Sequence, residues 1–138
     1  MRRRHFLQAL LAAPPIAAGL SGRRAAAAPF VWFTQPAFAA AQAAGKPILV
    51  DVWASWCPVC AKQAPTLAAV ETDPAFGELS IFKVNFDTQK DVLRAFGVQK
   101  QSTLIAFHGA REIGRATGIT APEEIRALLA SALVPAAG

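Results

Sequence analysis

The sequence predicts an α/β fold in which a single domain is built on a central β-sheet flanked by helices. The chain has 138 residues, a length that favours one domain with one hydrophobic core. From Pro29 onward, segments with a strand pattern alternate with segments with a helix pattern. Residues 48–53 form a nearly continuous apolar run, as expected of a strand that helices cover on both faces.

The first half of this domain is expected to contain two strands and two helices, separated by turn-forming and helix-ending residues. Gly45 and Pro47 end the first helix, and Asp73-Pro74 ends the second. The expected elements are, in chain order, an edge strand at 30–33, a helix at 36–44, the apolar strand at 48–53 and a helix at 57–70.

The second half adds three strands and two helices. His108-Gly109 is a hairpin signal between the last two strands, and Thr120 to Glu123 resemble a capping box that opens the last helix. The expected elements are strands at 81–86, 103–107 and 112–116, a helix at 88–96, and a final helix whose inward face carries Ile125, Leu128, Leu129 and Leu133.

The positive charge of the chain is concentrated in its first 29 residues. The formal net charge is +5, yet five of the 14 basic residues precede Phe30 and all nine acidic residues lie from Asp51 onward. The remaining bases and acids balance, so the domain lacks the basic footprint of a nucleic-acid-binding protein. We therefore expect no nucleic-acid partner.

Residues 1–28 have the pattern of a signal peptide, and residues 29–138 are expected to form the mature domain. A charged start is followed by an apolar stretch at 6–20 and by a run of small residues that suits cleavage. A membrane anchor fits less well, because Pro14-Pro15 interrupts a stretch that is shorter than the ~20 apolar residues of a spanning helix. Arg3-Arg4-His5-Phe6-Leu7-Gln8 resembles a twin-arginine export signal, which implies periplasmic localisation.

The two cysteines of the chain, Cys57 and Cys60, lie where the apolar strand passes into a helix. Their spacing places both sulfurs on one side of the first helical turn, within reach of each other. Unpaired amides and the helix dipole favour the thiolate form of Cys57, which is the attacking species in disulfide exchange. The pattern therefore predicts a redox centre in which Cys57 attacks a disulfide and Cys60 resolves the mixed disulfide.

Two other uses of this cysteine pair, a structural disulfide and a zinc site, fit the sequence less well. A disulfide between residues three apart closes a very small loop and stabilises a fold little. A tetrahedral zinc site needs four ligands, and one copy of the domain offers only the two cysteines and His108, in a predicted turn. The expected redox group is thus the cysteine pair itself, with no bound metal or other cofactor.

The segment Val50-Asp51-Val52-Trp53-Ala54-Ser55-Trp56-Cys57-Pro58-Val59-Cys60 resembles the thioredoxin superfamily, and the likeness extends over residues 30–133. It implies a thioredoxin fold with a mixed sheet, and thiol:disulfide oxidoreductase activity on protein substrates. It also implies that Trp56, Pro58 and Ser102 contact the substrate. Ser102 stands where the family has a cis-proline, so the peptide before it is expected to be either trans or a strained cis bond.

Within that superfamily, residues 44–47 and 73–76 resemble the periplasmic thioredoxin-like domain of DsbD-type transmembrane disulfide reductases. This likeness implies a reductant. It further implies that Asp51 is a buried carboxylate with a raised pKa that accepts the proton of Cys60, with Lys83 as its neighbour. Since the chain has no further cysteines, a second protein must supply its electrons, and a membrane electron donor is expected.

Two alternatives remain beside a monomeric oxidoreductase. In the family, the cis-proline is also thought to keep metals off the cysteines, so Ser102 could open the site to metal. Two chains would then form a four-thiolate zinc or iron-sulfur site across a dimer. The other alternative is a chaperone for the maturation of periplasmic metalloproteins or cytochromes.

Overall fold

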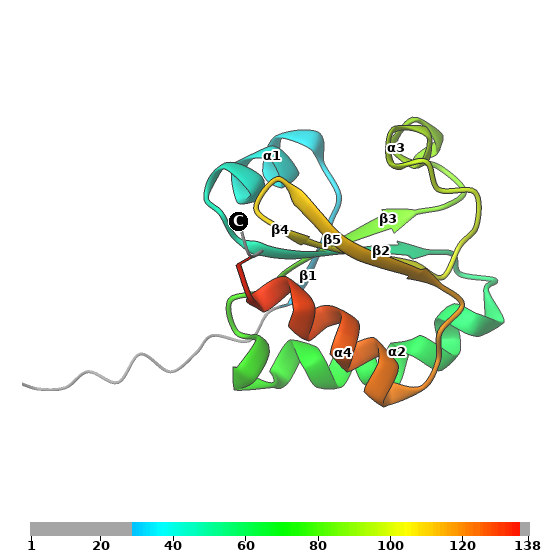
Figure 1. Cartoon of the computed structure of the whole chain (residues 1–138). Coiled ribbons are helices and arrows are strands. Elements are labelled where there is room, and N and C mark those ends of the chain that lie inside the picture. The colour runs from blue at the N-terminus through cyan, green and yellow to red at the C-terminus, as the bar shows by residue number, and fades with distance from the viewer. Residues whose placement is uncertain (1–28, 136–138) are drawn as a thin grey trace, which may run out of the picture.

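The computed structural model describes residues 29–135, so the predicted signal peptide lies outside the described residues. The α/β prediction is confirmed: within this range a five-stranded sheet is flanked by helices on both faces (Figure 1). The elements are β1 (Phe30–Trp32), α1 (Gln35–Ala43), β2 (Pro47–Trp53), α2 (Pro58–Thr72), the 3-10 turn η1 (Pro74–Phe76), β3 (Ser80–Asn85), α3 (Lys90–Phe96), β4 (Thr103–His108), β5 (Arg111–Thr117) and α4 (Pro122–Leu133).

The sheet is mixed and has the strand order β1-β3-β2-β4-β5. β3 runs parallel to both β1 and β2, whereas β4 runs antiparallel to β2 and to β5. β1 lies at the edge, as its pattern predicted, and β2 lies at the centre with five consecutive buried residues. The redox motif thus follows the most enclosed strand of the sheet.

Two apolar clusters hold the layers together. α2 and α4 cover one face of the sheet, and α1 and α3 cover the other (Figure 1). Alternate residues of β2 serve the two clusters: Leu49 packs toward α2 and α4, and Val50 packs toward α1 and α3. Asp51 follows the same alternation as Leu49, which directs its carboxylate toward the face covered by α2.

The start of the last helix differs from the prediction. The expected capping box at Thr120 is wrong, because Ala121 occupies the N-cap and no side chain caps the helix there. Pro122 follows at the first helical position, where its missing N–H leaves no donor unsatisfied, and Glu123 and Glu124 lie in the first turn. The helix therefore begins without a hydroxyl cap.

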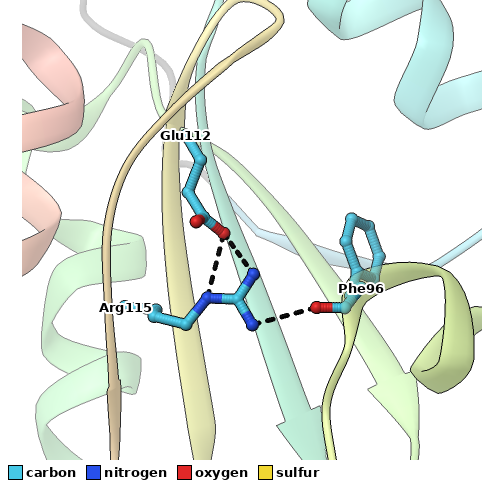
Figure 2. Close-up of polar contacts among 3 residues, drawn as sticks. All are labelled: Phe96, Glu112 and Arg115. Carbon is cyan, nitrogen blue, oxygen red and sulfur yellow. Dashed lines mark hydrogen bonds and ion pairs between the residues drawn. The ribbon is translucent and has the colours of Figure 1, made fainter.

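A side chain of β5 fixes the end of α3. Arg115 donates to a carboxylate oxygen of Glu112 and, over 2.9 Å from Nη1, to the backbone carbonyl oxygen of Phe96 (Figure 2). A guanidinium at the last carbonyls of a helix satisfies groups that the helix leaves without a partner. This contact joins the C-terminal end of α3 to β5.

Candidate active site

Cys57 and Cys60 lie together at the start of α2, as their spacing predicted. Cys57 is the N-cap residue, and its sulfur accepts a hydrogen bond of 3.1 Å from the backbone N–H of Cys60. Both side chains are buried, with 3% and 4% of their surface exposed, and both are free thiols. The pair therefore has the proximity that a reversible disulfide requires.

The two sulfurs occupy different surroundings. Burial raises the pKa of the Cys60 thiol to about 11, and the hydrogen bond with Cys57 acts in the same direction. Backbone hydrogen bonds from Ala54 and Ser102 oppose this rise. A thiol with so high a pKa needs a proton acceptor before it can attack a disulfide.

Asp51 is a carboxylate that can act as this proton acceptor. It lies in the middle of β2 with 3% of its surface exposed, and burial raises its pKa to about 6. Lys83 partly opposes the rise through its charge, and Glu71 adds to it. A carboxyl group with this pKa exchanges protons near neutral pH, as a general base requires.

A cavity of about 270 Å³ connects these groups. Its walls include Asp51 of β2, Cys60 and Glu71 of α2, and Lys83 of β3, together with apolar side chains. A space of this size has room for water molecules, and its polar walls can hold them in place. A proton of Cys60 can therefore pass to Asp51 through the cavity.

Lys83 lies directly opposite Asp51 in the register of β2 and β3. Its ammonium nitrogen lies 4.0 Å from the ring centroid of Phe30 and 5.4 Å from that of Trp53. The aromatic faces hold the cation beside the cavity, from where its charge lowers the pKa of Asp51. Lys83 is thus a neighbour of Asp51, as the resemblance implied.

Trp56 and Trp53 have different environments. Trp56 is 55% exposed, its indole N–H donates to the carboxylate of Asp87 at 2.9 and 3.1 Å, and its ring meets Phe86 edge-on. Trp53 packs against the cysteine pair from within the domain. Pro58 is exposed at the first turn of α2, next to Trp56 on the surface that a substrate would meet.

Ser102 lies beside the cysteine pair, and the peptide before it is trans. Its φ is 59°, in the left-handed region that non-glycine residues rarely adopt. The residue is 95% buried: its N–H donates to Val52 over 2.7 Å, and its hydroxyl donates to the carbonyl of Gln101 over 2.5 Å. The trans alternative is therefore the one that this chain adopts.

Sequence reasoning missed two polar residues of α2 near the site. Gln63 is 1% exposed and donates to the carbonyl oxygens of Ser102 and Ile119 over 3.3 and 2.9 Å. Glu71 faces the cavity about three helical turns after Cys60, on the same side of the helix. Both could have been found by drawing the face of α2 that contains Cys60 and asking which polar residues share it.

Among the described residues, no group of three or more histidine, cysteine or acidic side chains could hold a metal ion. His108 lies at the end of β4, where its Nδ1 makes a 2.7 Å hydrogen bond with the carbonyl oxygen of Ala132 in α4. This contact gives the histidine a structural partner. Within residues 29–135, no helix has the length and apolarity needed to cross a membrane.

Comparisons with known proteins agree with this geometry. Residues 30–131 match the family model described as Thioredoxin. A thioredoxin of Alicyclobacillus acidocaldarius is 35% identical over 88 residues, which cover 64% of this chain and 83% of that protein. The crystal structure of Trxlp from Edwardsiella tarda has a TM-score of 0.69 and 46% identity, covering 71% of this chain and 95% of that one. The crystal structure of thioredoxin NaTrxh from Nicotiana alata has a TM-score of 0.61 and 27% identity, covering 67% of this chain and 78% of that one.

Proposed function

The chain belongs to the thioredoxin family and is a thiol:disulfide oxidoreductase, and from this premise we propose that it is an exported reductant of protein disulfides. The observation that carries the proposal is the contact between Cys57 and Cys60 at the start of α2, beside the cavity that contains Asp51. The likeness of residues 44–47 and 73–76 to DsbD-type periplasmic domains supports the direction of electron flow.

The proposed reaction moves two electrons and two protons. The thiolate of Cys57 attacks a substrate disulfide, and one substrate sulfur leaves as a thiolate that takes up a proton. Cys60 then transfers its proton to Asp51 through the cavity and attacks the sulfur of Cys57. This step releases the second substrate sulfur as a thiolate, which takes up a proton from solvent, and leaves the Cys57–Cys60 disulfide. A partner, proposed to be a membrane electron donor, must then reduce this disulfide.

The reduction potential tests the direction. A reductant is expected to have a potential near that of thioredoxin, about −270 mV, measured by equilibration with glutathione buffers and counting of free thiols. A value near the DsbA potential, about −120 mV, would instead identify an oxidant. Metal analysis and sedimentation of the same sample test the proposed metal-free monomer, which one bound metal per two chains would contradict.

Export is proposed from the sequence of residues 1–28. The test replaces Arg3 and Arg4 together with lysine, which keeps the charge but removes the paired guanidinium groups. The uncleaved chain should then accumulate in the cytoplasm. The matched control replaces Arg23 and Arg24 with lysine, and equal export of both double variants would contradict a twin-arginine signal.

Trp56 is proposed to anchor protein substrates beside Cys57. Trp56→Ala is expected to raise KM for a protein disulfide about tenfold, because truncation of a central aromatic contact commonly costs above 1 kcal/mol. Turnover of a small aromatic disulfide should change less than twofold. Trp32→Ala removes an indole of similar exposure, 51%, from β1 and serves as the control. Equal KM changes in the two variants would contradict the anchoring role.

A further inference from the structure

Three hydrogen bonds hold the backbone of Ser102 in place next to the redox centre. Its N–H donates to the carbonyl oxygen of Val52 over 2.7 Å, and its own carbonyl accepts from Gly118 N–H over 3.0 Å and from the Gln63 amide over 3.3 Å. These bonds tie the residue to β2, to the end of β5 and to α2. They fix a conformation with a φ of 59°, which costs a non-glycine residue conformational energy.

The same carbonyl of Val52 also lies near the resolving sulfur. The sulfur of Cys60 is 4.0 Å from the oxygen of Val52, so the Ser102 N–H and the Cys60 thiol converge on one acceptor. When Cys60 is protonated, its S–H can donate to this oxygen. When Cys60 is ionised, that donation is lost, and the backbone of Ser102 favours this form because its hydrogen bond lowers the pKa of Cys60.

We propose that the backbone N–H of Ser102 stabilises the Cys60 thiolate as Cys60 attacks the mixed disulfide, a contact that proline at this position could not make because proline has no N–H. The inference rests on the proposed roles of Cys57 and Cys60. In this proposal, the backbone N–H of Ser102 stabilises the thiolate, and Gln63 and Gly118 position that backbone.

The charged surroundings of Cys60 leave a role for such a donor. The cavity is lined by two carboxylates, Asp51 on β2 and Glu71 on α2, and by the ammonium group of Lys83 on β3. Burial raises the pKa of Cys60, and Cys57 raises it further. The backbone hydrogen bonds of Ala54 and Ser102 lower it. A neutral N–H fixed by the fold supplies stabilisation that needs no second buried charge.

The first test separates the N–H from the hydroxyl by three changes at residue 102. An ester in place of the amide between Gln101 and Ser102 removes the N–H and keeps the side chain, Ser102→Ala removes only the hydroxyl, and Ser102→Gly also accommodates the positive φ without strain. Proline would not test the N–H alone, because its ring holds φ near about −65° whereas Ser102 has a φ of 59°. In stopped-flow reactions of the full chain with a small aromatic disulfide, the ester should slow release of the second thiol relative to the attack by Cys57 at least about tenfold, the effect of one charge-assisted hydrogen bond. Ser102→Ala and Ser102→Gly keep the N–H, so the ratio of the two rates should stay within about twofold of that of the unsubstituted chain.

Equal slowing in the ester and in Ser102→Ala would assign the effect to the hydroxyl and overturn the proposal, as would an unchanged resolving step in the ester. A second test needs no change at residue 102. In the Cys57→Ser chain, the NMR shift of the Ser102 amide proton should titrate with the Cys60 thiol, and the added Cys60→Ser substitution should remove the titration. An amide signal that does not move would also overturn it, whereas the proposed direction of electron flow depends only on the measured potential.

Discussion

Cys57→Ser is expected to abolish disulfide reduction, lowering kcat/KM by at least about a thousandfold. The hydroxyl that replaces the thiol is a far weaker nucleophile at neutral pH and cannot form the mixed disulfide on which exchange depends. Serine is also a favoured N-cap residue, so α2 should still begin at the same place. The loss of activity should therefore occur without loss of the fold, measured by circular dichroism of the same samples.

Cys60→Ser is expected to give a different result. Cys57 can still attack, but nothing inside the domain can resolve the product, so substrate proteins should remain attached through Cys57. Non-reducing gels and mass spectrometry detect these adducts, and added dithiothreitol should release them. Equal activity of the two variants, or adducts on Cys60 in the Cys57→Ser chain alone, would reverse the assigned roles.

The same pair of variants separates catalysis from a chaperone function. A chaperone that holds partners on this surface needs no sulfur chemistry, so Cys57→Ser should preserve its effect in cells. A reductant should lose that effect entirely. Complementation by the Cys57→Ser chain of a strain that lacks the protein would therefore favour the chaperone alternative over the proposed function.

The elements that the sequence predicted correctly are those whose signals are local. The apolar run of β2, the Gly45 turn and the cysteines at the start of α2 each determine their own structure within a few residues. The predicted strands and helices consequently agree with the structure to within about two residues at most ends. The fold class followed from the order of these elements and from the resemblance carried by the motif.

The features that could not be predicted depend on contacts between distant segments. The Thr120 capping box has the right residues, but the chain places Ala121 at the N-cap instead. The left-handed trans conformation of Ser102 depends on Val52, Gly118 and Gln63, which are far from it in sequence. The two polar residues of α2 also join the site through distant segments: Gln63 donates to the carbonyl oxygens of Ser102 and Ile119, and Glu71 raises the pKa of Asp51 in β2.

Asp51→Asn is expected to change the pH dependence of stability. Folding raises the pKa of Asp51 from 3.8 to about 6, so the folded chain keeps a proton that the unfolded chain has released between those values. Stability from this group is therefore lost as the pH rises through that window. The two-unit shift corresponds to about 3 kcal/mol. Urea unfolding should show the variant gaining up to that amount relative to the unsubstituted chain between pH 4 and pH 8, whereas Asp91→Asn, on the surface of α3, should not.

The same substitution should slow the resolving step of catalysis while leaving the first attack nearly unchanged. An amide cannot accept the Cys60 proton, and loss of a general base commonly lowers the rate of its step about a hundredfold or more. The unsubstituted chain should resolve the mixed disulfide faster as the pH rises through about 6, the pKa of Asp51, and Asp51→Asn should lack this inflection. Single-turnover kinetics from pH 5 to pH 9 measure the rate of each step and its pH dependence.

Because removal of the buried charge stabilises the fold above pH 6, a slower but more stable variant would separate the catalytic role of Asp51 from a structural one. An inflection that persists in the variant would show that another group accepts the proton.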